Sequence, residues 1–270
     1  MKAVLNRDLA GQRVLEARVM GPLVVRWPTV EEFTNVLDGN RLFETERRGK
    51  FLLLRFESGH CLAIHLMLTG HLQLAGTQTP RRKKTSWLLA FDNNRELRYF
   101  DQKLDGKVYL VPKAELSTVP RFSEMGPDVL DASLTYEVFA KRIRRFPGQV
   151  KRTLVNDIFV AGVGNAYVDE ILFTAGIYPF ARVRSLREEQ IHALYSAIHA
   201  VYEWAIPIVA QRMGDTIDEK VRDFLKVHRK GGQPCPNCGT TITQIEPNQR
   251  ITSYCRVCQN WGQTGGPSAS

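Results

Sequence analysis

The sequence predicts a multi-domain α+β protein in which a β-rich half, a helical middle and a C-terminal zinc ribbon follow one another along 270 residues. Three observations lead to this fold class. Short apolar runs with period-two alternation dominate residues 1–121, apolar residues recur at helical spacing over 122–227, and two CxxC pairs lie within 228–260. Residues 261–270, ending in glycine, proline and serine, are expected to form a disordered tail.

The N-terminal half is expected to fold as a β-sandwich, with a barrel as the alternative. Strands are predicted at 13–26, 51–56, 61–68, 87–91 and 107–111. A short helix is predicted at 28–37, and the basic segment 77–85 is expected to be a loop.

In the middle segment, helices are predicted at 133–145, 150–155, 165–175, 186–209 and 219–227. Gly162 and Gly164 precede Asn165, where one of these helices begins. Exposed N–H groups at a helix start favour an anion such as phosphate, and glycines let it approach closely. Asn165 can cap the helix, donate its amide to a phosphate, or do both; a tight turn without a ligand is the alternative. Lys151 adds a positive charge nearby, although a single lysine is more often a solvated surface residue.

The C-terminal cysteines predict one structural Zn²⁺ held by Cys235, Cys238, Cys255 and Cys258. They form two CxxC pairs separated by sixteen residues, which is zinc-ribbon spacing. A closed four-thiolate site leaves no open coordination position, so the metal is expected to stabilise the fold without doing chemistry. Disulfides and a redox-active CxxC are the alternatives. Cys61, within a predicted strand, is interpreted as a small buried hydrophobe.

The charge balance indicates the kind of partner. The net charge is +9, which favours a polyanion such as nucleic acid over an anionic membrane surface. A hydrophobic content of 43% excludes a wholly disordered chain. No uninterrupted apolar run approaches the roughly 20 residues of a membrane span, and the N-terminus lacks the pattern of a secretory signal. With reduced cysteines, these features predict a cytoplasmic protein without membrane contact.

Four segments carry a resemblance to one family. Residues 157–179, DIFVAGVGNAYVDEILFTAGIYP, resemble the helix–two-turn–helix of the formamidopyrimidine-DNA glycosylase / endonuclease VIII family of base-excision repair enzymes. The ribbon, including Arg250 in NQRITSYCRVCQ, resembles the zinc finger of that family. HLMLTG at 65–70 resembles its HLxM[ST]G loop, and RRGK at 47–50 resembles its lysine-bearing hairpin. The resemblance covers nearly the whole chain in the expected order.

This resemblance implies a DNA glycosylase with abasic-site lyase activity on oxidised bases in double-stranded DNA. Nothing in the sequence suggests more than a monomer, which is the state we expect. The resemblance also implies catalytic roles for Lys50, in proton transfer and DNA contact, and for Arg250, in gripping phosphates and in the second elimination step. Lys151 and Asn165 match residues that grip the DNA backbone. Leu68 matches a side chain that fills the space left by a flipped nucleotide.

Two regions depart from the family pattern. Residues 101–106, DQKLDG, stand where the family carries DPRRFG. Lys103 retains one DNA-binding charge, but Asp105 occupies the position of the aromatic wedge, for which Leu104 is a possible substitute. The stretch 213–227 is also shorter than the lesion-capping loop of the branch that acts on 8-oxoguanine. Lesion preference is therefore left open.

The family nucleophile is missing from the first residues of the sequence. In the family, the amine of an N-terminal proline attacks the sugar, and a glutamate follows it. This chain begins Met1-Lys2-Ala3-Val4, and aligning residues 5–14 with the first helix and following strand of the family leaves its PELPE segment without a counterpart. Either translation begins upstream, which we favour, or the protein has lost the nucleophile. In both cases we expect the 270-residue chain to be deficient in the family chemistry.

Two other classes of function compete with this prediction. A catalytically inactive, zinc-dependent protein that binds damaged DNA accounts for the missing nucleophile. A zinc-ribbon protein that binds RNA or a protein partner agrees with the charge but not with the segment 157–179. For DNA binding, replacement of Lys50, Lys151 or Arg250 is expected to weaken affinity and flatten its salt dependence.

Overall fold

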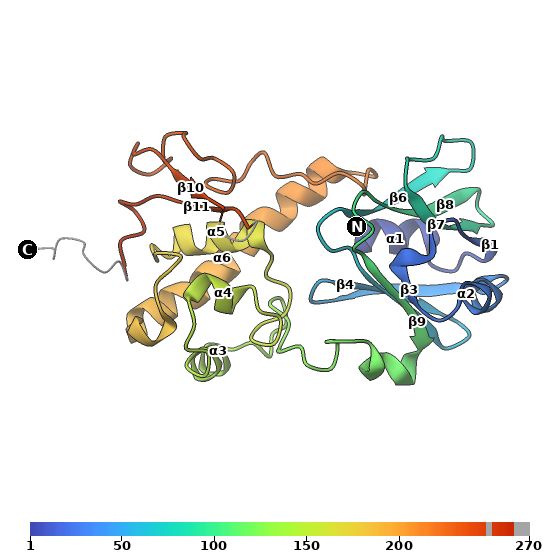
Figure 1. The fold of residues 1–270 in the computed structure, drawn as a ribbon, viewed down its shortest axis with the longest axis horizontal. Coiled ribbons are helices and arrows are strands. Elements are labelled where there is room, and N and C mark those ends of the chain that lie inside the picture. The colour runs from blue at the N-terminus through green and yellow to red at the C-terminus, as the bar shows by residue number, and fades with distance from the viewer. Residues whose placement is uncertain (247–249, 262–270) are drawn as a thin grey trace, which may run out of the picture. The chain divides into compact units, whose positions relative to one another are not determined.

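A computed structural model of the chain describes residues 1–246 and 250–261 (Figure 1). Apart from Trp261, the predicted tail at 261–270 lies outside the described residues. The chain divides into two compact units. The first comprises Met1–Ser123 and Ala210–Val221, and the second comprises Glu124–Val209 and Arg222–Ser270.

The first unit is a β-sandwich of two sheets that share one apolar core. One sheet has the strand order β1-β7-β8-β6 and the other β2-β9-β5-β4-β3; within them only β2 and β9 pair in parallel. Trp87 and Tyr99 stack inside this core with ring centroids 5.6 Å apart. The strands are β1 (Val14–Val19), β2 (Val25–Trp27), β3 (Leu42–Arg48), β4 (Phe51–Phe56), β5 (His60–His65), β6 (Gly70–Gly76), β7 (Thr85–Phe91), β8 (Arg95–Asp101) and β9 (Lys107–Pro112). The predicted mixed α+β fold class is confirmed.

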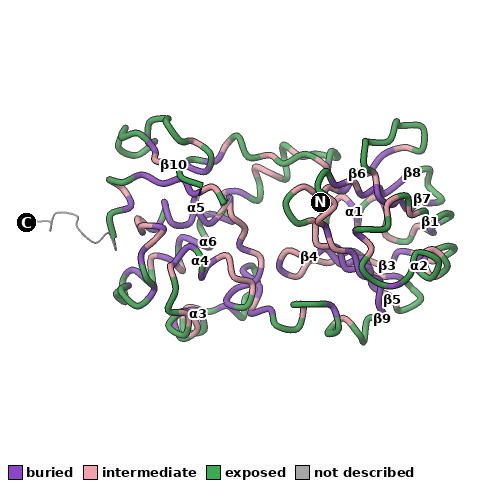
Figure 2. Tube along the Cα trace, viewed as in Figure 1, coloured by how far each residue is buried: buried purple, intermediate pink, exposed green. Residues whose placement is uncertain are grey.

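Short helices complete the first unit, and buried residues follow its strands while its loops are mostly exposed (Figure 2). Leu5 and Leu9 of one helix enter the sandwich core, and Asn6 accepts a hydrogen bond from the Thr45 N–H at 2.5 Å. The helices are α1 (Lys2–Leu9), α2 (Val30–Leu37) and the 3-10 turns η1 (Pro22–Val24) and η2 (Lys113–Thr118).

The prediction of one continuous strand at 13–26 is wrong. β1 ends at Val19, the chain turns through η1, and β2 joins the other sheet. Pro22 opens that turn, because its ring fixes φ near −65° and it lacks the N–H that a strand donates. Sequence reasoning also missed β3, β6 and β8. In β8 the charged Glu96 and Arg98 lie in the interior as an ion pair with a separation of 2.6 Å, which breaks the apolar pattern that identifies a buried strand.

The second unit is built around four helices: α3 (Tyr136–Ile143), α4 (Val150–Leu154), α5 (Asn165–Thr174) and α6 (Glu188–Met213), with the 3-10 turn η3 (Val183–Ser185) before α6. All four coincide with predicted helices. Thr135 caps α3 by accepting a hydrogen bond from the Val138 N–H at 3.4 Å. By its length and composition alone α6 could cross a membrane, but Leu194, Ile198 and Val201 place one of its faces in the core of this unit.

A helix predicted at 219–227 is absent, and the described chain there forms turns. One physical reason is that the N–H groups of Lys226, Val227 and His228 all donate to the carboxylate of Glu170, so they cannot form helical bonds to the preceding turn. Earlier in the same connection, Ile217 is buried in the sandwich core, which attaches Ala210–Val221 to the first unit.

The C-terminal ribbon contains one antiparallel pair, β10 (Thr243–Ile245) with β11 (Thr252–Tyr254), and the two CxxC turns. Cys255 follows β11 directly and is completely buried. Cys235, Ile242 and Cys255 form a small apolar cluster with Phe173 of α5, so the ribbon packs on that helix.

Candidate nucleic-acid interface and metal centre

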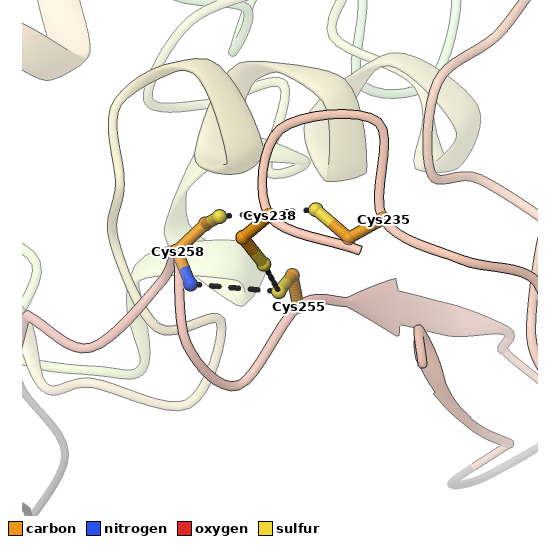
Figure 3. A group of neighbouring side chains, drawn as sticks. All are labelled: Cys235, Cys238, Cys255 and Cys258. Carbon is orange, nitrogen blue, oxygen red and sulfur yellow. Dashed lines mark hydrogen bonds between the residues drawn. The ribbon is translucent and has the colours of Figure 1, made fainter. Parts of the chain in front are cut away.

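The four cysteines of the ribbon converge on one point (Figure 3). Their Sγ atoms all lie within 4.8 Å of one another, with Cys235–Cys258 at 3.7 Å and Cys238–Cys255 at 3.5 Å. A tetrahedral site with Zn–S bonds of about 2.3 Å has edges of about 3.8 Å, whereas a disulfide needs about 2.05 Å. The thiol set therefore fits one structural Zn²⁺, as predicted, and the disulfide alternative is wrong.

Two adjacent carboxylates of α5 hold the ribbon and the chain that leads into it. Glu170 accepts hydrogen bonds from three consecutive backbone N–H groups at 226–228, at 2.8–2.9 Å. Asp169 accepts from His228 Nδ1 at 2.7 Å and from the Ser253 N–H at 3.2 Å. Both carboxylates are almost completely buried. Buried charges need such partners, so α5 can pack in this way only with the ribbon attached.

Lys151 completes this network from α4. Its Nζ donates to Asp169 Oδ1 at 2.7 Å, to the Ile251 carbonyl at 2.9 Å and to Thr252 Oγ1 at 2.8 Å. Burial lowers the pKa of Lys151, and the Asp169 carboxylate opposes that shift. The alternative of a solvated surface lysine is wrong, since Lys151 is only 6% exposed. Its predicted contact with DNA stays a prediction.

Asn165 is the first helical residue of α5 and does not cap it. Gly164 occupies the N-cap position, and no side chain of the described residues caps this helix start. The Asn165 amide donates instead to the Ile251 carbonyl at 2.9 Å. Arg250, next to Ile251 in the chain, is exposed. The structure therefore brings Lys151, Asn165 and the backbone beside Arg250 together at the start of α5.

The first unit carries the other predicted DNA contacts on loops at the ends of its strands. Leu68, between β5 and β6, is 70% exposed. Its carbonyl accepts a hydrogen bond from Lys220 Nζ at 2.8 Å, and neighbouring Met67 has a left-handed φ of 52°. Lys50 lies half-buried in the turn between β3 and β4. That turn is tightened by a hydrogen bond of 2.7 Å from Arg47 to the Gly49 carbonyl.

Asp101 joins the loop of Leu68 to the loop at 101–106. It is fully buried, its Oδ1 accepts from the Thr69 hydroxyl and from the Lys103 N–H, and its Oδ2 accepts from Tyr99 and from the Gly106 N–H at 2.9 Å. The Lys103 N–H also donates to Thr69 Oγ1 at 3.1 Å, and the Lys103 side chain is exposed. A Cβ on Gly106 would lie 1.7 Å from the Tyr99 hydroxyl, so only glycine fits there.

Leu104 and Asp105, the two residues considered for the position of the aromatic wedge, have different surroundings. Leu104 packs against the sandwich core with a left-handed φ of 55°, so it cannot act as a wedge without leaving that core. Asp105 has a buried Oδ1 with no hydrogen-bond partner in the described structure. Burial and the neighbouring Asp101 carboxylate raise the pKa of Asp105 above its ordinary value.

Sequence reasoning missed Asp101, Asp169, Glu170 and His228. The pair Asp169-Glu170 reads as an ordinary exposed acidic stretch of a helix. The one sign that these two acids are buried is the sequence around them. Val168 precedes them and Ile171 and Leu172 follow, so an exposed polar face at this point of the helix would be very narrow. Asp101 carries no local signal, since its four donors come from two loops and a strand.

Three family models match successive parts of the chain. They are described as the formamidopyrimidine-DNA glycosylase N-terminal domain at residues 1–108, the formamidopyrimidine-DNA glycosylase H2TH domain at 125–216, and a zinc finger found in FPG and IleRS at 232–260.

Whole-chain relatives agree with these matches. The chain is 35% identical over 262 residues to a formamidopyrimidine-DNA glycosylase of Desulforamulus reducens, covering 94% of each chain. It is 31% identical over 264 residues to that of Pelotomaculum thermopropionicum, covering 96% of each. Among solved structures, Lactococcus lactis Fpg in complex with abasic-site DNA is similar, with a TM-score of 0.87, 27% identity and 96% coverage of both chains.

The metal centre predicts a selective effect of cysteine replacement. Cys255→Ser removes one of four thiolates, so we expect the purified protein to lose most of its zinc and the ordered NMR signals of the ribbon. Cys61→Ser, a matched control because Cys61 is buried in the sandwich, should keep one Zn²⁺ per chain. Metal content and NMR dispersion are the measurements. Equal zinc in the two variants would contradict the assignment.

Asp105 predicts a pH-dependent stability difference. Because the pKa of Asp105 is raised in the folded state, its contribution to stability is present below the unfolded pKa of about 3.9 and is lost as pH rises through the folded pKa. We expect Asp105→Asn to stabilise the protein at pH 7 and to lose this advantage in acid.

Urea unfolding measured from pH 3.5 to pH 7, with the exposed Glu219→Gln as control, tests this expectation. The explanation fails if Asp105→Asn destabilises at neutral pH or shows no pH trend.

Proposed function

Because the chain belongs to the formamidopyrimidine-DNA glycosylase family, we propose that it is a base-excision repair DNA glycosylase with abasic-site lyase activity on oxidised bases in duplex DNA. The observation that supports this proposal is the zinc ribbon docked on the start of α5, where Asn165 binds the carbonyl of Ile251, the residue that follows the exposed Arg250. The relatives named above are glycosylases over the same length of chain.

In this proposal the second unit binds the phosphates of the damaged strand. A guanidinium can hold two phosphate oxygens in a fixed fork, so Arg250 is assigned the strongest contact. The first N–H groups of α5 lack a side-chain cap and carry the positive end of the helix dipole, which favours a second phosphate there. Such contacts position the duplex without reading its sequence.

In this proposal the loops of the first unit contact the DNA at the lesion. An exposed apolar side chain such as Leu68 can fill the space that a flipped nucleotide leaves in the stack. Lys103 supplies a positive charge from the adjoining loop, and Lys50 is proposed to contact DNA and assist proton transfer. Since Leu104 packs inward and Asp105 is an acid, we propose that this chain inserts Leu68 without an aromatic partner from residues 101–106.

The covalent step requires a nucleophilic amine. Attack on C1′ of the sugar forms the N–C1′ bond as the bond to the base breaks. Cleavage of the C1′–O4′ bond then opens the sugar ring and gives an iminium, an electron sink for elimination at the neighbouring carbons. Residues 1–4 are Met-Lys-Ala-Val and include neither the proline nor the glutamate that the family uses. A protein that binds damaged DNA without catalysis is kept as the second candidate function, and formation of a covalent adduct with abasic-site DNA distinguishes the two.

We further propose that the protein works as a monomer on double-stranded DNA in the cytoplasm. A reducing compartment keeps the four cysteines as thiolates for zinc, and the net charge of +9 favours a polyanion.

Salt dependence of DNA affinity tests the assigned phosphate contacts. Replacing Arg250 by alanine should weaken binding to a duplex with a tetrahydrofuran abasic analogue and reduce the slope of log K against log salt by about 0.9. Lys50→Ala should have a similar effect on the slope, whereas Lys141→Ala, which removes an exposed charge of α3, should have little. Binding measured by fluorescence anisotropy between 50 and 200 mM salt, roughly the range over which such contacts show, decides the matter. Unchanged slopes for both Arg250→Ala and Lys50→Ala would show that these residues do not contact DNA phosphates.

Trapping of a covalent adduct separates the two candidate functions. The polypeptide that begins at Met1 should bind abasic duplex DNA, yet form the borohydride-trapped adduct many orders of magnitude more slowly than the same chain preceded by a Met-Pro-Glu segment with its methionine removed. Trapping by neither form would favour the non-catalytic candidate. Full activity of the 270-residue form would contradict the expected deficiency.

A further inference from the structure

One backbone carbonyl in the second unit is held from two sides. The Ile251 oxygen accepts a hydrogen bond of 2.9 Å from Lys151 Nζ and another of 2.9 Å from Asn165 Nδ2. Ile251 directly follows the exposed Arg250 and precedes β11. The two donors come from different helices, α4 and α5, so the carbonyl cannot shift without breaking a bond to one of them.

The next two residues are fixed by the same network. Thr252 Oγ1 accepts from Lys151 Nζ at 2.8 Å, and the Ser253 N–H donates to Asp169 Oδ2 at 3.2 Å. All of these groups are buried or nearly so, and Asp169 is also bonded to Lys151 at 2.7 Å. Three consecutive residues after Arg250 are therefore bound to helices α4 and α5 by a connected set of charged hydrogen bonds.

The ammonium of Lys151 has little capacity left for an external ligand. Its three N–H groups point at three protein acceptors between 2.7 and 2.9 Å, and the residue is 6% exposed. A phosphate bound by this lysine would have to replace one of these acceptors, and loss of Asp169 as a partner would leave a buried carboxylate uncompensated.

We propose that Lys151 is a positioning residue: with Asp169 and Asn165 it fixes the backbone at 251–253, and so presents the Arg250 guanidinium to the DNA. This inference rests on the proposed DNA-binding function and changes how Lys151 serves it. Lys151 acts through Arg250. Because the backbone next to Arg250 is already ordered before DNA binds, less conformational entropy is lost when its guanidinium binds a phosphate, and the affinity is higher.

A double-mutant cycle between Lys151 and Arg250 tests this role. Lys151→Met keeps the length of the side chain and removes the ammonium. Alone it should weaken binding to tetrahydrofuran-containing duplex about tenfold or more, the value of a charged hydrogen bond. In the Arg250→Ala background the same change should have less than about a twofold effect and no further effect on the salt slope. With Lys50→Ala, in the other unit, the effects should multiply.

A direct phosphate contact gives the opposite pattern. Lys151→Met would then lower affinity and reduce the salt slope by about 0.9 even when Arg250 is absent, and this result would overturn the proposal. Equal weakening in every background, accompanied by loss of zinc or of thermal stability, would show a merely structural role and would also overturn it. Lys141→Met, an exposed lysine of the same unit, is the matched control.

Two further experiments keep the proposal testable. A milder variant serves if Lys151→Met does not fold, and a measurement without DNA serves if the protein does not bind DNA. Thr252→Val removes one acceptor of the ammonium, and its smaller effect on affinity should again vanish without Arg250. In the free Lys151→Met protein, NMR order parameters of the Ile251 and Thr252 amides should fall from about 0.85 toward 0.6. Unchanged order parameters would overturn the positioning role whatever the DNA experiments give, whereas lost order in a chain that binds no DNA would contradict only the proposed function.

Discussion

The second unit depends on burying two adjacent carboxylates, Asp169 and Glu170, inside the protein. Ionised carboxylates are strongly disfavoured away from water unless charged or N–H partners replace the water. Here Lys151, His228 and four backbone N–H groups do so, and all of them except Lys151 lie in or directly before the zinc ribbon. Removing one member of such a network typically costs about 3–5 kcal/mol, because the remaining charge stays buried. The acid pair therefore makes attachment of the ribbon to α5 a condition of folding.

Zinc and the acid pair have different tasks in this arrangement. The metal closes the ribbon locally through the two CxxC turns, and the carboxylates orient the closed ribbon on the helix. Only with both in place does Arg250 have a fixed backbone beside the uncapped start of α5. Asp101 has a comparable task in the first unit, where one buried carboxylate joins the loops that carry Leu68 and Lys103. In both units a buried acid orders an exposed cation.

Features encoded by local spacing could be predicted from the sequence. The zinc site follows from two CxxC pairs, and the helices at α3 to α6 follow from apolar periodicity, because both signals lie within a few turns of chain. What failed depends on contacts between distant residues. β8 was missed because its interior holds the ion pair Glu96–Arg98, and the helix expected at 219–227 was lost to Glu170. The buried state of Lys151 could not be foreseen either, since a lone lysine gives no sign of the acceptors that will surround it.

The most direct test is a crystal structure of the zinc-loaded protein bound to a duplex with an abasic-site analogue. The Arg250 guanidinium and the first N–H groups of α5 should contact phosphates of the damaged strand, while Lys151 Nζ stays within hydrogen-bond distance of the Ile251 carbonyl and Asp169. A complex in which Lys151 leaves Asp169 for a phosphate, or in which the DNA does not touch Arg250, would contradict the account.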